Sequence, residues 1–223
     1  MVTGKDERRN KNNLIIDRTE FEKVESFIYL GTEINSKNVV SQEIQKRLMI
    51  GNRAYFANIK LLKSKLLSRS SKLKIYKTLI RPVVTYACET WNISARDAYR
   101  LRVFERNIIR RIYGAVQDNG YWRRRTNNEI NQILQEEDIV RFIKAQRIRW
   151  IGHIERMSEN RTSRKIYKAS MTGRRKQGRP RKRWKDEVEE DLRMIKVRGW
   201  RDKAKDRTEW RQIVRQAKAH TEL

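Results

Sequence analysis

The chain has 223 residues, with 54 Lys or Arg against 27 Asp or Glu and a formal net charge of +27. Hydrophobic residues make up 38% and aromatic residues 9% of it, which excludes wholesale disorder because such a chain can bury a core. The surplus charge repels itself unless it meets a polyanion, so RNA and/or DNA is the expected partner. One Cys and two His exclude an internal disulfide and a structural zinc site, and neither a metal nor another cofactor is expected.

The apolar segments argue against a membrane protein. No apolar run approaches the roughly 20 residues that a spanning helix needs, so no membrane partner is expected. Residues 1–13 are charged and polar without an apolar h-region, unlike a secretory signal, and we expect an intracellular protein of the nucleus or cytoplasm. Cys88 lies in the apolar stretch 83–91 and is predicted to be a buried, inert thiol.

Two short apolar stretches lie near the start of the chain, at residues 14–16 and 24–30. They predict a small β-hairpin joined by the polar residues between them. From Ser41 as N-cap, apolar residues then recur every three and four positions as far as Leu66, which predicts one long helix. Gly51 lies on the apolar face of that helix and indicates close packing against another helix.

Two further helices are expected over residues 73–87 and 101–112. Pro82 should kink the first of them or divide it near Arg81, because proline has no N–H to donate. Gly114 should end the second. With the long helix before them, these two helices are expected to pack as a small bundle.

The rest of the chain also shows helical periodicity, interrupted by polar stretches. In order, we expect a loop at 117–120, helices at 127–135 and 139–157, a break at 173–180, and helices at 184–195 and 200–217. The fold class is therefore mainly α: a short N-terminal β-hairpin, a three-helix thumb-like bundle and a basic helical C-terminal domain.

Two rows of basic residues run along the predicted helices. The first is a stripe with seven-residue spacing on the long helix, which suits either a surface that follows a phosphate backbone or ordinary solvated lysines. The second is an arginine row with four-residue spacing, which suits bidentate phosphate contacts, and a binding role is favoured there. The stripe comprises Lys46, Arg53 and Lys60, and the row comprises Arg102, Arg106 and Arg110.

Residues 121–125 combine aromatic rings with guanidinium groups outside any helical face. The segment consists of Tyr121, Trp122, Arg123, Arg124 and Arg125. Base stacking with phosphate contact is one interpretation, and a loop anchored on the core by Trp122 is an equal alternative. Trp150, Trp184 and Trp210 are instead interpreted as core residues, because each follows the apolar period of its helix.

Residues 161–185 hold twelve Lys or Arg and no Asp or Glu. Within this segment, Gly178-Arg179-Pro180 resembles the AT-hook core that lies in the minor groove of A·T-rich DNA, while a basic loop before the next helix is the plainer alternative. We expect an exposed loop at about 171–182. Its candidate phosphate-binding residues, together with the one that follows it, are Arg174, Arg175, Lys176, Arg179, Arg181, Lys182 and Arg183.

The acidic residues do not predict an active site. Glu136, Glu137 and Asp138 fan around an expected helix start, where carboxylates suit the helix dipole. Glu187, Glu190 and Asp191 share one side of a helix and are interpreted as a solvated, ion-paired face. His153 has no nucleophile near it in sequence. We expect no catalytic residue, no metal ligand and no small-molecule substrate.

Five motifs, taken in order, are similar to the C-terminal part of the reverse transcriptase of non-LTR (LINE-type) retrotransposons. They are FIYLGTEI, IYKTLIRPVVTYACETW, FERNIIRRIYG, RIRWIGHIERM and GRPRKRWKDEVEEDL. The resemblance covers nearly the whole chain. It implies the end of a polymerase palm at 1–37, a helical thumb at 38–115 and a basic C-terminal domain at 116–223.

The resemblance also implies which parts of the family pattern are missing. The catalytic carboxylates of that family lie on a Tyr-X-Asp-Asp hairpin and an earlier palm strand, which are expected upstream of residue 1. Many relatives carry a Cys/His zinc knuckle, and this sequence has no counterpart of it. Thumb helices of the family grip the template-primer duplex, a role that would fall to the basic stripe or the arginine row.

We therefore expect a nucleic-acid-binding C-terminal fragment of a retrotransposon-derived RNA-directed DNA polymerase, inactive by itself. Two alternatives stay open. The chain is a segment of an active reverse transcriptase when an upstream palm is supplied, or it is an AT-hook-like architectural or regulatory DNA-binding protein.

Overall fold

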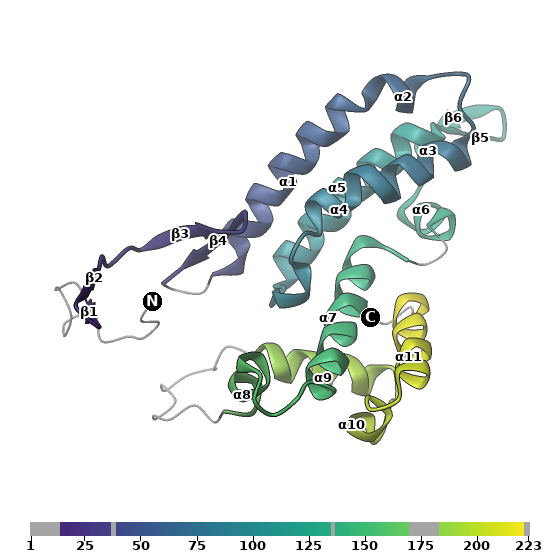
Figure 1. Ribbon diagram of the computed structural model, residues 1–223. Coiled ribbons are helices and arrows are strands. Elements are labelled where there is room, and N and C mark those ends of the chain that lie inside the picture. The colour runs from purple at the N-terminus through teal and green to yellow at the C-terminus, as the bar shows by residue number, and fades with distance from the viewer. Residues whose placement is uncertain (1–13, 37–38, 135–136, 170–182, 221–223) are drawn as a thin grey trace.

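The computed structural model describes residues 14–36, 39–134, 137–169 and 183–220, and within them the protein is mainly helical, as predicted. Two hairpins extend from one end of a group of helices formed by α1 to α6, and a second group, α7 to α11, lies below it in Figure 1. The π-helical turn Tyr76–Ile80 lies between α3 and α4, and the 3-10 turn Cys88–Thr90 precedes α5. The helices of the two groups are α1 Val40–Ala57, α2 Ile59–Lys63, α3 Arg69–Ile75, α4 Arg81–Val84, α5 Ala95–Tyr113, α6 Asn127–Ile133, α7 Ile139–Glu155, α8 Thr162–Lys168, α9 Trp184–Met194, α10 Trp200–Lys203 and α11 Arg207–Ala219.

The N-terminal strands form two antiparallel hairpins, so the predicted pairing of residues 14–16 with 24–30 is wrong. Strand β1 (Leu14–Ile16) pairs with β2 (Thr19–Phe21), and β3 (Ser26–Tyr29) pairs with β4 (Thr32–Asn35). Each hairpin has a two-residue turn with positive φ at both positions. Such turns match the twist of the strands, so each strand pairs with its immediate neighbour in the chain.

Helix α1 is shorter than the predicted long helix and begins elsewhere. Val39, not Ser41, is its N-cap residue, and the Ser41 hydroxyl donates to Asp97 Oδ2 at 2.6 Å. The helix ends at Ala57, and the Asn58 side chain donates to the Ala54 carbonyl at 2.8 Å. This local hydrogen bond competes with the regular helical pattern and separates α1 from α2.

Close packing of Gly51 is confirmed. A Cβ atom at this position would lie 2.3 Å from Cγ2 of Val84 and 3.1 Å from Cζ of Phe104. Gly51 therefore lets α1 approach both α4 and α5 at the centre of the first hydrophobic core, which also contains Ile44 and Leu101.

The predicted division near Arg81 is confirmed, since α4 begins at that residue. The π-helical turn Tyr76–Ile80 directly precedes α4, whose second residue, Pro82, has no N–H for the regular pattern. Helix α5 begins after its N-cap Ser94 and ends, as predicted, at Gly114, whose φ is 72°.

Helix α7 contributes to two cores. Its first half packs in the core of α1 to α6, and its second half packs with α9, α10 and α11. Gly152 admits the indole of Trp210, whose Nε1 donates to the Ile148 carbonyl at 3.1 Å. Trp184 and Trp210 pack as predicted, but Trp150 is only half-buried beside His153.

The predicted helix over 200–217 is two helices. Asp206 separates α10 from α11, and its carboxylate accepts the backbone N–H groups of Thr208 and Glu209 at 2.6 and 3.4 Å. An Asp in this position caps a helix start, and the apolar period continues across it because both helices face the same core.

A buried ion-pair network joins the two groups of helices, so the interpretation of Glu187 and Asp191 as a solvated face is wrong. Arg147 is 1% exposed and donates to the Trp91 carbonyl at 3.1 Å, to Glu187 at 2.6 Å and to Asp191. Lys144 reaches the same Asp191 at 2.9 Å. These carboxylates on α9 are partners of a buried guanidinium on α7.

Candidate nucleic-acid interface

Three arginines gather where α5 faces the segment 124–127. We call Arg106, Arg110 and Arg124 the arginine cluster. Arg110 donates to the Arg125 carbonyl at 3.0 Å and to the Asn127 side chain at 2.6 Å, and Arg124 reaches the Asn107 side chain at 3.4 Å. All of these acceptors are neutral. Within the described ranges, none of the three guanidinium groups has a carboxylate within 4.0 Å.

The charges of the arginine cluster act on one another. Partial burial, and then the positive charges of Arg124 and Arg106, lower the pKa of Arg110. Arginine remains charged in proteins, so this lowering reports the cost of partial burial and the repulsion between the guanidinium groups, not neutralisation. An anion placed among the three groups would relieve that repulsion and take up their free donors.

Arg102 belongs to the predicted row but not to this cluster. Its Nε donates to Asp138 Oδ2 at 2.8 Å, and Asp138 is the N-cap residue of α7, where it also accepts the Arg141 backbone N–H. Arg102 therefore links α5 to the start of α7. The charge of Arg102 is therefore balanced by a carboxylate, unlike the charges of the arginine cluster.

Residues 116–123 form a third hairpin, where a loop was predicted. Strand β5 (Val116–Asp118) pairs with β6 (Tyr121–Arg123) through Asn119 and Gly120, whose φ values are 49° and 85°. Asn-Gly between two such strands is the sequence signal for this turn. The hairpin projects beyond the helices at its end of the molecule (Figure 1).

The hairpin exposes its aromatic rings. Tyr121 is 81% and Trp122 73% exposed, so the alternative in which Trp122 anchors a loop on the core is wrong. Arg123 instead holds the hairpin, donating to Asp118 at 2.7 Å and to both carboxylate oxygens of Glu129 at 3.0 Å. The hydrogen bond from Arg123, and then one from the Thr126 backbone, lower the pKa of Glu129 to about 2.

The predicted stripe on the first helix does not stay on one helix. Lys46 pairs with Glu33 of β4 at 2.7 Å. Arg53 is exposed on α1, and Lys60 is exposed on α2 beyond the break at Asn58. Arg53 and Lys60 keep free charges in the described part of the chain, whereas the charge of Lys46 is balanced internally.

Most of the predicted basic loop cannot be placed. Arg174, Arg175, Lys176, Arg179, Arg181 and Lys182 lie outside the described residues, as does the whole Gly-Arg-Pro core. Arg183 is exposed at the N-cap of α9, and its backbone N–H donates to Asp186 at 3.3 Å.

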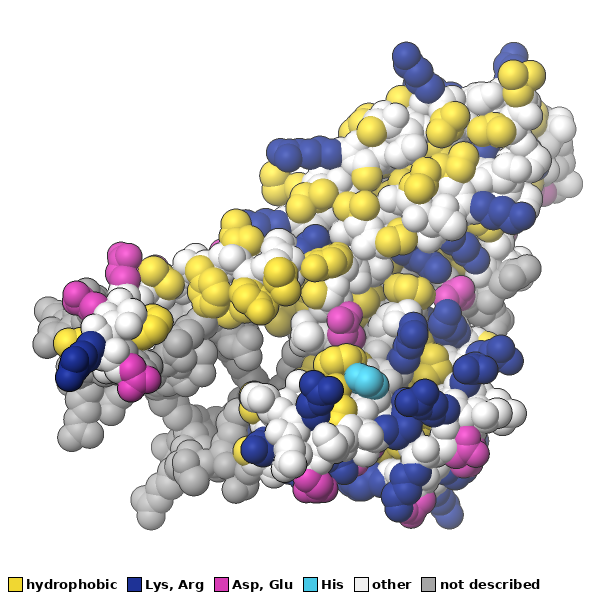
Figure 2. Space-filling view, in the orientation of Figure 1, with side chains coloured by type: hydrophobic (Ala, Val, Ile, Leu, Met, Phe, Trp, Pro, Cys, Tyr) yellow, Lys and Arg dark blue, Asp and Glu magenta, His cyan; other side chains and the backbone are white. Residues whose placement is uncertain are grey.

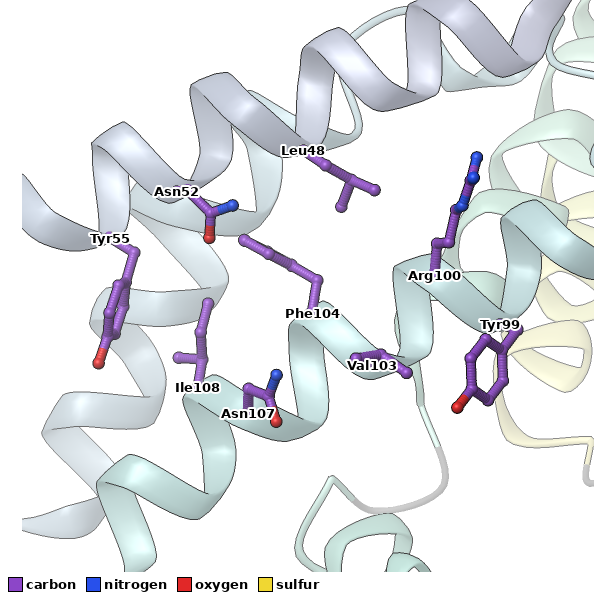
Figure 3. A pocket seen from close by; sticks show the side chains of 9 residues that line it. All are labelled: Leu48, Asn52, Tyr55, Tyr99, Arg100, Val103, Phe104, Asn107 and Ile108. Atoms are coloured by element: carbon purple, nitrogen blue, oxygen red, sulfur yellow. The ribbon is translucent and has the colours of Figure 1, made fainter.

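An apolar groove between α1 and α5 was missed by sequence reasoning. It has a volume of about 390 Å³ and is lined by Leu48, Asn52 and Tyr55 from one helix and by residues between Tyr99 and Ile108 from the other (Figure 3). In the view of Figure 2, apolar side chains gather over the helices of the first group, and Lys and Arg gather over the second. Tyr99, 66% exposed at the groove, lies off the apolar period of α5 and was the available signal.

A second hollow, of about 530 Å³, lies among α8, α9 and α10 and is rich in cations. Its charges are largely balanced: Arg164 pairs with Glu155, Arg201 with Glu189 and Lys205 with Asp202, each at 2.7 Å. The arginine cluster is thus the more strongly positive of the two sites.

The buried titratable groups are structural. Glu105 accepts from the Tyr76 hydroxyl and from the Ile139 backbone N–H, both at 2.7 Å, and burial raises its pKa to about 7. Burial also raises the pKa of the Cys88 thiol to about 12, which confirms the predicted buried thiol. Among the described residues, no group of three or more His, Cys, Asp or Glu could hold a metal ion, and no helix could span a membrane.

The described residues thus form a mainly helical protein whose acid-free arginine cluster lies beside an exposed aromatic hairpin. The sequence is 26% identical over 203 residues to a Caenorhabditis elegans protein named as an uncharacterized transposon-derived protein, covering 88% of this chain and 72% of the relative. The similarity supports a transposon origin. No protein-family model matches the chain, and no solved structure matches it significantly.

Proposed function

We propose that this chain is a nucleic-acid-binding C-terminal part of a retrotransposon-derived RNA-directed DNA polymerase, which holds RNA or DNA through phosphate contacts and has no catalysis of its own. The observation that carries the proposal is the arginine cluster: Arg110 and Arg124 have neutral hydrogen-bond partners, and none of the three guanidinium groups pairs with a carboxylate of the described residues. Such a group of fixed donors suits bidentate binding of phosphate oxygens.

The surrounding charges favour a backbone contact over the reading of base edges. Arg111 is exposed near the end of α5, and Arg53 and Lys60 are exposed on α1 and α2. The net charge of +27 attracts any polyanion over a long range at low salt. The similarity to a transposon-derived protein agrees with this origin, because copying a mobile element requires proteins that hold its nucleic acid.

Replacing Arg106, Arg110 and Arg124 together with Gln is expected to weaken nucleic-acid binding about tenfold to hundredfold at low salt. The plot of log K against log[salt] should become shallower by roughly 2 to 3, since each lost phosphate contact removes slightly less than one unit. Fluorescence anisotropy with a labelled 20-nucleotide strand and a 20-base-pair duplex measures both quantities.

The matched control removes the same charge elsewhere. Arg193, Arg211 and Arg215 are exposed on α9 and α11, and their joint replacement with Gln should change the affinity much less. An equal loss in both triple variants would show that only the net charge matters. A flat salt dependence of the parent chain would overturn the proposal as a whole.

The purified 223-residue chain is expected to extend no primer on an RNA or DNA template with Mg²⁺. The physical reason is the lack of gathered carboxylates in the described residues, since two-metal phosphoryl transfer needs them. Incorporation of labelled nucleotides checks this, with an added polymerase as positive control. Extension that co-purifies with the chain through two orthogonal columns would contradict it.

A further inference from the structure

The third hairpin presents two large aromatic rings to solvent, which is unusual for side chains that bury so much apolar surface. Tyr121 and Trp122 are 81% and 73% exposed at the turn-proximal end of β6. Their backbone is nevertheless well held. The Asn-Gly turn closes the hairpin, and the contacts of Arg123 with Asp118 and Glu129 fasten it to its own first strand and to α6.

The register decides which face of the hairpin each ring occupies. Trp122 is paired with Gln117, and Tyr121 is paired with Asp118. Directly opposed residues share a face, and neighbouring residues alternate, so the two rings lie on opposite faces. On the Trp122 face, the directly opposed residue, Gln117, is uncharged. On the Tyr121 face, Arg123 balances the carboxylate of Asp118 at 2.7 Å, so neither face repels a polyanion.

The hairpin leads directly into the arginine cluster. Arg124 follows Trp122 by two residues, which is about 7 Å of extended chain, and its guanidinium is directed to Asn107 on α5. Arg110 of the same helix donates a hydrogen bond to the Arg125 carbonyl at 3.0 Å. These fixed contacts therefore hold an exposed aromatic ring next to guanidinium groups that pair with no carboxylate of the described residues.

We propose that this hairpin recognises unpaired nucleotides, with Trp122 as a stacking platform for a base while the arginine cluster holds a neighbouring phosphate. The inference rests on the proposed function and adds the preferred partner, a single strand or a single-stranded end. Bases inside a duplex are already stacked on both faces, whereas an unpaired base offers a free π-face to an aromatic ring. Tyr121 contributes a second, weaker platform on the opposite face.

The proposal is tested with Trp122→Ala, using dT20, a 20-nucleotide RNA of mixed sequence and a 20-base-pair DNA duplex in separate anisotropy titrations. We expect about a tenfold loss of affinity for both single strands and less than a twofold loss for the duplex. The salt slope should not change, because no charge is removed. Trp122→Phe should retain most of the single-strand affinity, since a ring remains.

Two controls show whether a loss of affinity comes from lost stacking, from misfolding, or from the removal of any exposed aromatic ring. Phe56→Ala removes a ring that is 65% exposed on α1 rather than on the hairpin, and should leave all three affinities unchanged. Far-UV circular dichroism and urea midpoints should coincide for the parent and all variants, because the Trp122 side chain is 73% exposed.

The outcomes distinguish this inference from the proposed function. If Trp122→Ala binds single strands as tightly as the parent, or loses single-strand and duplex affinity equally, the stacking inference is overturned. The phosphate-binding proposal survives either result provided that the Arg106, Arg110 and Arg124 variant still lowers affinity and salt slope. If the parent chain binds no probe, both proposals fail. The exposed rings of the hairpin would then favour contact with a protein partner.

Discussion

Replacing Arg147 with Ala is expected to lower the free energy of unfolding by about 3–5 kcal/mol. The side chain is 1% exposed and holds the Trp91 carbonyl, Glu187 and Asp191. Its removal leaves two carboxylates near the junction of the two cores with Lys144 as their remaining cation. The loss is large because an uncompensated buried charge costs far more than the pair itself contributes.

Urea unfolding followed by circular dichroism measures this loss, with the midpoint and slope fitted together. Arg149→Ala is the matched control, an exposed arginine two residues further along α7, and should stay within about 0.5 kcal/mol. Arg147→Lys should fall between the two, since an ammonium group cannot reproduce the fixed fork of donors. Equal stabilities for the Arg147 and Arg149 variants would contradict the structural role of this network.

The second expected result is a pH dependence of stability that arises from Glu105. Its pKa in the folded protein is about 7, against a usual value of 4.5, chiefly because the carboxyl group is buried. The folded state therefore binds this proton more tightly than the unfolded chain does. The contribution to stability is fully present below pH 4.5 and is lost as the pH rises through 7. Between pH 5 and 8 the loss should be about 2–3 kcal/mol.

Urea midpoints at half-unit steps from pH 5 to 8 measure the effect as the difference between the parent chain and Glu105→Gln. The Gln variant has no titrating group there, so this difference isolates one carboxyl from all other groups. In Tyr76→Phe the loss of stability should occur at higher pH, because the Tyr76 hydroxyl favours the ionised carboxylate and its removal raises the pKa of Glu105 further. A pH-independent difference between the parent and Glu105→Gln would show that Glu105 titrates normally.

Local features of the chain were well predicted from the sequence. The apolar periods located the helices, Gly114 ended α5, and Gly51 marked a close helix contact. The helical periods depend on residues within a turn or two of one another. The two glycine predictions depend on the lack of a Cβ atom, which allows a positive φ or a close helix contact. The Asn119-Gly120 turn was equally local, and the hairpin it forms was missed because its strands are only three residues long.

Pairings between distant residues were not predictable in this way. Arg102 meets Asp138 across 36 positions, and Arg147 meets Asp191 across 44. Single-sequence periodicity carries no information about which helix will pack against which. Basic residues of the predicted arginine row therefore looked equivalent, although one of them serves as a partner for a helix cap.

The sequence by itself determined that the chain is mainly helical and rich in Arg and Lys, because composition and period depend only on residue type and spacing. The tertiary structure alone decided which of those charges are free. A guanidinium keeps an unbalanced charge only when no carboxylate reaches it, and only the packing of α5 against the hairpin and α7 determines that.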